Sequence, residues 1–270
     1  MKKWFLIPVI LAGYGPLSAL ETSGRLSFAM RGGMFSPSSR TYNREIVPAF
    51  NQSIEDFVTQ AAAFGYSTKS DSLDEIGLGP VFGAEVEWFF RPYLSAALGT
   101  EFFRKAPSAF SQASVQEGGT TYELRQDYRV KATLIPVLLT VRYHIPLNRW
   151  RFYAGAGAGY CLGRLDFRND FSLRINGSAA EGESSRNQGA GRAIVPHLSA
   201  GLNFELTGRI VLAADLRYAF GEIDSFEIKN HTEADMVGRE MTYVTAGGAE
   251  RPVRWELNGL RFGISAKYVF

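Results

Sequence analysis

The feature that most constrains this chain is a two-residue alternation of apolar and polar side chains. In the last eleven residues Leu260, Phe262 and Ile264 fall on one face of an extended strand, and Arg261 and Ser265 fall on the other. A period of two is typical of a strand whose two faces meet different surroundings. The pattern recurs in eight segments, at residues 26–31, 82–90, 94–102, 135–144, 152–162, 196–205, 209–220 and 260–270. The sequence therefore predicts an all-β fold.

The connections between these segments alternate between short and long. Tight turns are expected at Arg91–Pro92, Pro146–Arg149 and Thr207–Gly208. The other connections are long and polar, at residues 36–77, 106–126, 169–190 and 224–257. This layout is typical of an eight-stranded antiparallel membrane barrel, an up-and-down meander with short periplasmic turns and long extracellular loops. A soluble β-sandwich is the alternative. A ten-stranded barrel is a second one, if residues 226–257 form an extra hairpin.

The N-terminus has the features of an export signal. Lys2 and Lys3 precede the short apolar run 4–12, and small residues at Ser18 and Ala19 offer a cleavage site. The run is too short for a spanning helix, which needs about 20 apolar residues. We expect residues 1–19 to be a signal peptide and residues 20–270 to be one outer-membrane barrel domain.

Aromatic side chains gather near two of the predicted short turns. Trp88, Phe89, Phe90 and Tyr93 flank the first, Tyr143, Trp150, Phe152 and Tyr153 flank the second, and Phe270 ends the last segment. Aromatic rings form such girdles where a membrane meets water. A core cluster in a soluble sheet is the alternative interpretation.

The segment 152–160, with the letters FYAGAGAGY, resembles the glycine-alternating strand of OmpA-like and opacity-protein-like outer-membrane β-barrels. The segment 135–143 resembles the strand that precedes it in that family, and residues 259–270 are similar to its terminal assembly signal. The resemblance implies an eight-stranded barrel that the barrel assembly machinery recognises through Phe262, Ile264, Tyr268 and Phe270. It implies no single activity, because members serve as structural barrels, adhesins and surface antigens. We expect the peptidoglycan-binding domain of full-length OmpA-type proteins to be absent.

Charged residues fall on the face of the predicted strands that would line the lumen. They are Arg31, Glu85, Glu87, Glu101, Arg142, Asp215, Arg217, Arg261 and Lys267. An eight-stranded barrel is just wide enough to be filled by side chains, and charges away from water must pair. We therefore expect an internal salt-bridge network in a polar, filled lumen. A narrow pathway for ions or small solutes, opened when the network re-pairs, is the alternative.

An enzymatic role is the weaker alternative. His197 and Ser199 have the His-x-Ser spacing of one lipid A deacylase type, and two residues apart on a strand they share a face. The alternation places them toward the lumen, however, and lipid A would lie outside. His144 and His231 stand alone in the sequence, and the single Cys161 is interpreted as a small apolar wall residue. We expect no enzyme, no metal site and no cofactor.

The long loops are where a partner would bind, because loops on a rigid scaffold commonly carry function. An extracellular ligand is expected there, in addition to outer-membrane lipid and lipopolysaccharide; loops that only shield the barrel are the alternative. Ile54, Phe57, Val58 and Ala61 recur at helical spacing, and predict a short helix over 53–64 with Ser53 as its cap. A net charge of +2 and the lack of a basic run argue against nucleic acid.

Overall fold

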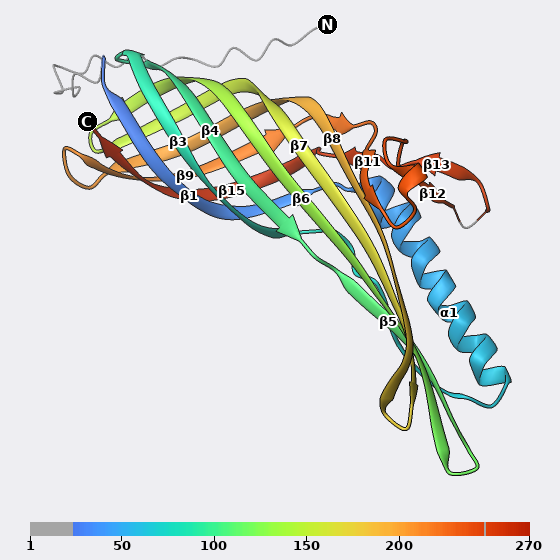
Figure 1. The fold of residues 1–270 in the computed structure, drawn as a ribbon. Coiled ribbons are helices and arrows are strands. Elements are labelled where there is room, and N and C mark those ends of the chain that lie inside the picture. The colour runs from blue at the N-terminus through green and yellow to red at the C-terminus, as the bar shows by residue number, and fades with distance from the viewer. Residues whose placement is uncertain (1–23, 246) are drawn as a thin grey trace, which may run out of the picture.

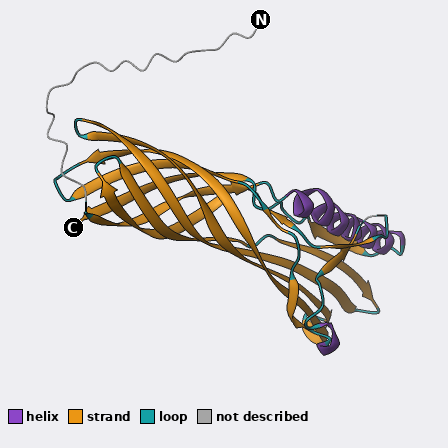
Figure 2. Ribbon diagram, turned by 90° about the horizontal axis from the view of Figure 1, so that it is seen from above, coloured by secondary structure: helices purple, strands orange, loops and turns teal. Residues whose placement is uncertain are grey.

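The computed structural model describes residues 24–245 and 247–270, so the predicted signal peptide lies outside the described residues. Apart from one α-helix and two short helical turns, the regular elements of these described residues are strands, which confirms the all-β prediction. Eight strands form a ring, seen as a barrel in Figures 1 and 2. They are β1 (Leu26–Pro37), β3 (Gly79–Arg91), β4 (Leu94–Lys105), β6 (Thr120–Leu147), β7 (Trp150–Ile175), β8 (Ser178–Glu205), β9 (Ile210–Ala219) and β15 (Gly259–Val269).

The ring is defined by antiparallel pairing. β1 pairs with β3, and the series continues through β4, β6, β7, β8 and β9 to β15. β15 then pairs with β1, with Ser27 opposite Val269 and Pro37 opposite Gly259. All eight ring strands therefore have hydrogen-bonded neighbours on both sides, which removes the free sheet edges of the ring.

The connections at one end of the ring are short, as predicted. β3 and β4 are joined through residues 92–93, β6 and β7 through residues 148–149, and β8 and β9 through residues 206–209. Asn148 has a positive φ of 56°, a conformation that asparagine tolerates in tight turns. Residues 24 and 270 lie at this same end, as Figure 1 shows for the C-terminus.

The connections at the other end differ from the expected irregular loops. The segments 106–126 and 169–190 are mostly strand, because β6, β7 and β8 run on for 28, 26 and 28 residues. β5 (Ser108–Glu117) and β2 (Ser67–Asp71) extend this sheet beside β6, and β11 (Glu227–His231) extends it beside β8. The result is a six-stranded sheet, β2-β5-β6-β7-β8-β11, that projects beyond the ring in Figure 1. We call it the sheet extension.

Among its described residues, the segment 226–257 contains no hairpin that enters the ring. β12 (Thr242–Val244) pairs with β13 (Glu250–Pro252), and β14 (Trp255–Glu256) pairs with β10 (Glu222–Ile223). A short helical turn, η2 (Ala234–Met236), lies between β11 and β12. Since β11 pairs with β8 outside the ring, the ten-stranded alternative does not match the observed pairing.

The predicted helix exists but begins earlier. Helix α1 spans Val47–Ala63 and follows a π-helical turn, η1, at Tyr42–Ile46. Pro48 lies in its first turn, where a missing N–H costs nothing. Ser53 is therefore in the middle of the helix, and its predicted role as the cap is wrong. α1 lies alongside the sheet extension in Figures 1 and 2. Among the described residues no helix is long and apolar enough to cross a membrane.

Candidate functional site

The outer surface of the ring is apolar, as the alternation predicts. On β6 the outward side chains from Ile135 to Ile145 are exposed and alternate with buried ones, and this stretch covers eleven positions. A tilted strand needs about 9–11 residues to cross a bilayer. Large apolar side chains are also exposed on the outer face of the other ring strands, including Met30, Phe82, Leu98, Phe152, Leu198, Leu216 and Ile264. We call this surface the apolar belt.

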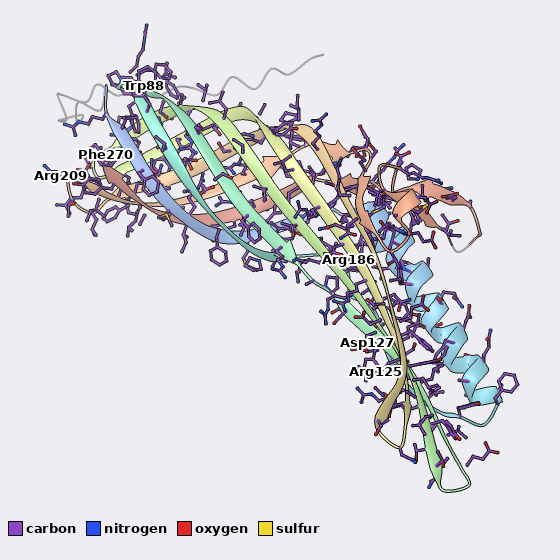
Figure 3. The ribbon with its side chains drawn as sticks, in the orientation of Figure 1. Trp88, Arg125, Asp127, Arg186, Arg209 and Phe270 are labelled. Atoms are coloured by element: carbon purple, nitrogen blue, oxygen red, sulfur yellow. The ribbon has the colours of Figure 1, made fainter. Side chains whose placement is uncertain are left out.

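Aromatic rings border the belt at the short-turn end. Trp88, Tyr93, Tyr143, Trp150 and Phe152 are exposed there, and Phe270 is 72% exposed; Figure 3 shows Trp88 and Phe270 at this end. The girdle prediction is wrong for Phe89 and Tyr153, which are buried in the interior of the ring. The two-residue alternation explains this. Phe89 directly follows the outward-facing Trp88, and Tyr153 directly follows the outward-facing Phe152.

Basic side chains border the belt at the opposite end. The outward residues next to the last apolar ones are Arg104 after Phe102, Arg164 after Leu162 and Arg192 before Ile194. Arg104 and Arg164 share a level, because both lie opposite Thr133 in the pairing. All three are exposed, and none has an acidic partner within ion-pair distance among the described residues. We call Arg104, Arg164 and Arg192 the basic arc.

The nine predicted lumen charges are all buried inside the ring. Glu85 accepts two hydrogen bonds from Arg142, both of 2.6 Å, and a further short contact from Arg31. Glu87 pairs with Lys267 at 2.9 Å and with Arg142 at 3.1 Å. The alternation thus assigned these residues to the correct face, and the structure brings them into contact.

The network continues toward the middle of the ring. Asp215 pairs with Arg31 at 2.8 Å and with Arg261 at 2.6 Å, and Glu101 pairs with Arg217 at 2.9 Å. A contact of 2.9 Å between Nε of Arg261 and the carboxylate of Glu101 connects the Asp215 pairs to the Glu101–Arg217 pair. The nine residues comprise five cations and four carboxylates, so the interior is nearly neutral. Charge pairs of this kind satisfy groups that would otherwise be costly to bury.

Two histidines, His144 and His197, take part in this interior. Nε2 of His144 lies 2.8 Å from the hydroxyl of Ser95 and 3.3 Å from Glu87, and its ring packs between Phe89 and Tyr153. Nε2 of His197 lies 2.8 Å from Oγ1 of Thr140, and Ser199 is buried beside it on the same face. Both His197 and Ser199 therefore face inward, as the alternation predicts. No cluster of metal ligands occurs among the described residues.

The glycines of β7 give these side chains room. A Cβ on Gly157 would lie 1.9 Å from the carbonyl oxygen of Leu139 and 2.9 Å from the ring of His197. A Cβ on Gly155 would lie 2.7 Å from the carbonyl of Val141 and 3.0 Å from the side chain of Arg142. The alternating glycines of this strand therefore let the inward-facing residues of β6 and β8 approach one another.

The other half of the interior is apolar, which corrects the prediction of a wholly polar lumen. Phe35, Val81, Phe103, Leu134 and Cys161 continue the ring interior toward the sheet extension. Segments between the ring strands close the ring interior at the end that faces the sheet extension. Their buried side chains are Tyr42, Ile46, Val47, Ile54, Leu73, Ile76, Ile223, Phe226, Ile228, Met241, Val253, Trp255 and Leu257. We call these thirteen residues the apolar plug.

The plug is fixed by a few polar contacts, one of them buried and the others part-buried. Nε1 of Trp255 donates to the hydroxyl of Ser39 at 2.9 Å, and the carboxylate of Glu256 accepts from the N–H and the hydroxyl of Thr41 at 3.0 and 2.7 Å. Burial raises the pKa of the Tyr42 phenol. Sequence reasoning missed the plug, although Val253, Trp255 and Leu257 continue the inward face of β15 at the same two-residue spacing.

The outward face of the sheet extension carries charges in rows. Arg129 lies opposite Arg168, and Arg168 lies opposite Arg186, so three arginines are neighbours across β6, β7 and β8. Arg186 pairs with Asp166 at 2.6 Å and Arg168 pairs with Asp170 at 2.9 Å. Partial burial opposes ionisation of Asp170, but hydrogen bonds from Ser184 and Arg168 prevail and lower its pKa. Figure 3 shows Arg125, Asp127 and Arg186 on this part of the molecule.

No family model and no curated protein matches this chain. It is similar in structure to Ail, the attachment invasion locus protein of Yersinia pestis, solved with the heparin analogue sucrose octasulfate. The TM-score is 0.42 and the identity 12%, over 92% of this chain and 99% of that one. Neisserial surface protein A gives a TM-score of 0.33 and 11% identity over 91% and 97% of the two chains.

The outer-membrane protease OmpT of Escherichia coli gives a TM-score of 0.34 and 10% identity over 92% and 94% of the two chains. All three TM-scores are below 0.5, and all three identities are below 25%.

Proposed function

We propose that this chain is an eight-stranded outer-membrane β-barrel with a closed lumen, which works at the cell surface through its sheet extension. The observation that carries this proposal is the length of β6, β7 and β8. A strand of 28 residues spans roughly 90 Å at 3.3 Å per residue, whereas the bilayer core is about 30 Å thick. Most of each strand is therefore available outside the membrane as a stiff platform.

The orientation follows from the ends of the ring. The short turns and the aromatic girdle belong to the periplasmic end, and the sheet extension to the extracellular end. The exposed Phe262, Ile264, Tyr268 and Phe270 on the outward face of β15 would then be the assembly signal that the barrel assembly machinery recognises. A role as a structural barrel, an adhesin or a surface antigen is compatible with this arrangement.

Site-specific labelling in intact cells tests the orientation. Glu117→Cys, at the tip of the β5–β6 hairpin, is expected to react with a membrane-impermeant maleimide. The matched variant Arg149→Cys, in a short turn, is expected to react only after the outer membrane is permeabilised. The native Cys161 is buried and should give little background. Labelling of Arg149→Cys but not Glu117→Cys in intact cells would contradict the proposal.

A narrow ion pathway is the second candidate, because a charged network lines half of the lumen. The apolar plug argues against an ion pathway, because Trp255, Phe226 and Ile223 are almost fully buried between the charged network and the sheet extension. Planar bilayer recordings separate the two candidates: the closed-lumen proposal predicts no unitary current steps, and regular ohmic steps would favour the pathway. A lipid A-modifying activity has less support, because His197 and Ser199 face the interior and not the lipid.

A further inference from the structure

The outer part of strand β8 has a neighbouring strand on only one side. β7 pairs with β8 out to Ser178. On the other side of β8, β9 pairs with residues 197–205 and β11 pairs with residues 187–190. In the described part of the chain no strand pairs with residues 178–186 on that side, and all nine residues are exposed. The sheet extension therefore has a free strand edge near the tip of the β7–β8 hairpin, which lies far from the ring in Figure 1.

The backbone of Arg186 shows which groups point to this free edge. Its N–H donates to the hydroxyl of Thr232 at 2.7 Å, and the N–H of Thr232 donates to its carbonyl at 3.0 Å. Both backbone groups of Arg186 thus point away from β7. The direction repeats at every second residue of a strand, so Ser184 and Gly182 also direct their N–H and C=O groups to the free edge. Because Thr232 directly follows β11, a strand added beside Ser184 and Gly182 would continue the line that β11 begins.

The side chains along this edge leave its backbone accessible. Residues 178–185 read SAAEGESS, with no proline and no side chain larger than glutamate. An extra residue in β8 between residues 179 and 181 disturbs the pairing near the tip. Natural sheets usually protect a free edge with proline, lysine, a bulge or a covering element. Here the bulge protects only the tip, and residues 181–186 remain open to another chain. We call residues 181–186 the β8 edge.

Two glutamates give the β8 edge its charge. Glu181 lies opposite Leu173, and Glu183 lies opposite Phe171. Both partners share the face of β7 on which Phe167 packs against helix α1, so the two glutamates lie on the α1 side of the sheet. Neither has a cation within ion-pair distance among the residues that the structure describes. The β8 edge thus combines outward-directed backbone groups with two unpaired carboxylates on one face.

These carboxylates decide which kind of strand fits beside the β8 edge. A second copy paired edge to edge would place glutamates opposite glutamates, and like charges directly opposite one another destabilise a sheet. A strand with lysine or arginine at every second position would instead place its cations opposite Glu181 and Glu183. Residues that face each other there form non-hydrogen-bonded pairs, with Cα atoms about 4.5 Å apart, which brings their side chains close. Charge complementarity therefore favours a basic segment over a second copy.

We propose that the β8 edge binds an extended basic segment of another protein by strand addition. The backbone of the segment would form hydrogen bonds with Gly182 and Ser184, and its lysine or arginine side chains would pair with Glu181 and Glu183. In this mode the backbone bonds give affinity and the alternate side chains give specificity. The inference deepens the proposed function by naming the chemistry of a partner, and it rests on that function for the location of the β8 edge outside the cell.

Fluorescence anisotropy with a labelled, end-blocked heptapeptide that alternates threonine and lysine tests the inference. The full chain is held in nanodiscs of phosphatidylcholine, which carry no net charge. Binding is expected to saturate. N-methylation of the threonines removes the N–H groups that would face Gly182 and Ser184, and should weaken binding at least tenfold. N-methylation of the lysines is the matched control, because their N–H groups would face away from β8, and it should leave binding unchanged.

Variants of the β8 edge test the same contacts from the side of the protein. Gly182→Pro removes one edge-directed N–H, at a position where proline is tolerated in an edge strand, and should weaken binding at least tenfold. Gly182→Ala keeps the N–H and is the matched control, since its Cβ would meet only the carbonyl of Phe171, at 3.5 Å. The double variant Glu181→Lys with Glu183→Lys should bind a peptide with glutamate in place of lysine and lose the lysine peptide.

Each of three results would overturn the inference. Equal binding of the two N-methylated peptides would mean that charge alone attracts the probe. No binding of the lysine peptide to the wild type would mean that Glu181 and Glu183 only keep other strands away. A dimer in sedimentation that Gly182→Pro abolishes would assign the edge to a second copy. The electrophoretic heat shift of the same samples reports the barrel independently, so a shifted protein that binds no peptide refutes the β8 edge as a site and leaves the proposed function standing.

Discussion

Arg142 and Glu85 face each other inside the ring through two parallel hydrogen bonds, Nη1 to Oε1 and Nη2 to Oε2, each of 2.6 Å. Both side chains are almost completely buried. Such bidentate pairs fix the geometry of both partners. Because Glu85 also contacts Arg31, this pair links β3 and β6 to β1 across the interior.

Removing one side of this pair leaves a buried charge with an incomplete set of partners. Arg142→Met is expected to lower the free energy of unfolding by about 3–5 kcal/mol, because Glu85 and Glu87 both lose a cation. The exposed Arg254→Met is the control and should change stability little. Urea titration of the protein in lipid vesicles measures both. Equal stability of Arg142→Met and wild type would show that the network does not support the fold.

The glycines of β7 give a second stability prediction. Gly157→Ala would place a Cβ 1.9 Å from the carbonyl of Leu139, and relief of that contact must separate β6 and β7 locally. We expect a loss of about 1–3 kcal/mol, as for other over-packed sites. Gly208→Ala is the matched control, because no atom lies within 4 Å of the point that its Cβ would occupy. The same urea titration applies, and tolerance of Gly157→Ala would contradict the close approach of the strands.

These two sites also show what the sequence could and could not predict. The two-residue period identified the ring strands and the inward face of Arg142, since alternation depends only on the local backbone and on the surroundings of each face. The length of β6 to β8 was missed because beyond the membrane both faces meet water or polar neighbours, so the contrast between faces fades. Asn169 on one face of β7 and Asp170 on the other both fall in the predicted loop 169–190.

The apolar plug was missed for a different reason. Its members, among them Ile76 and Trp255, come from segments far apart in the sequence and belong to one buried cluster only in the folded chain. The helix was predicted from its apolar spacing, but its start was misplaced because Ser53 resembles a cap while Pro48 actually lies in the first turn. The pairing of the lumen charges likewise depends on register, which a single sequence does not give.

The contact between Tyr243 and Glu45 predicts a pH effect at the surface. Burial and this hydrogen bond raise the pKa of Tyr243 from 10.0 to about 12. A raised pKa means that the folded state holds the proton more tightly. The stabilisation is therefore complete below pH 10 and is lost as the pH rises through about 12. The difference in absorbance at 295 nm between wild type and Tyr243→Phe should titrate near pH 12; a midpoint at pH 10 would mean that the contact does not form.

The basic arc predicts binding of anionic lipid. Arg104, Arg164 and Arg192 lie next to the outer edge of the apolar belt, where the phosphate groups of lipopolysaccharide would lie if the proposed orientation is correct. Lipopolysaccharide is expected to raise the temperature of the electrophoretic transition of the wild type, and to raise it less in a triple variant with serine at these positions. Arg174→Ser, at the tip of the β7–β8 hairpin, is the control. An equal rise in all three proteins would exclude the arc as a lipid site.

Whether the ring is a closed barrel in the outer membrane can be read from the electrophoretic mobility of the outer-membrane fraction on SDS gels, with and without boiling. A closed, hydrogen-bonded ring with an ion-paired interior resists SDS until it is heated. The protein is therefore expected in this fraction, with an unboiled band that migrates differently from the boiled one. A soluble periplasmic protein with one mobility under both conditions would contradict the membrane barrel, and the alternating strands would then belong to a soluble β-sheet protein.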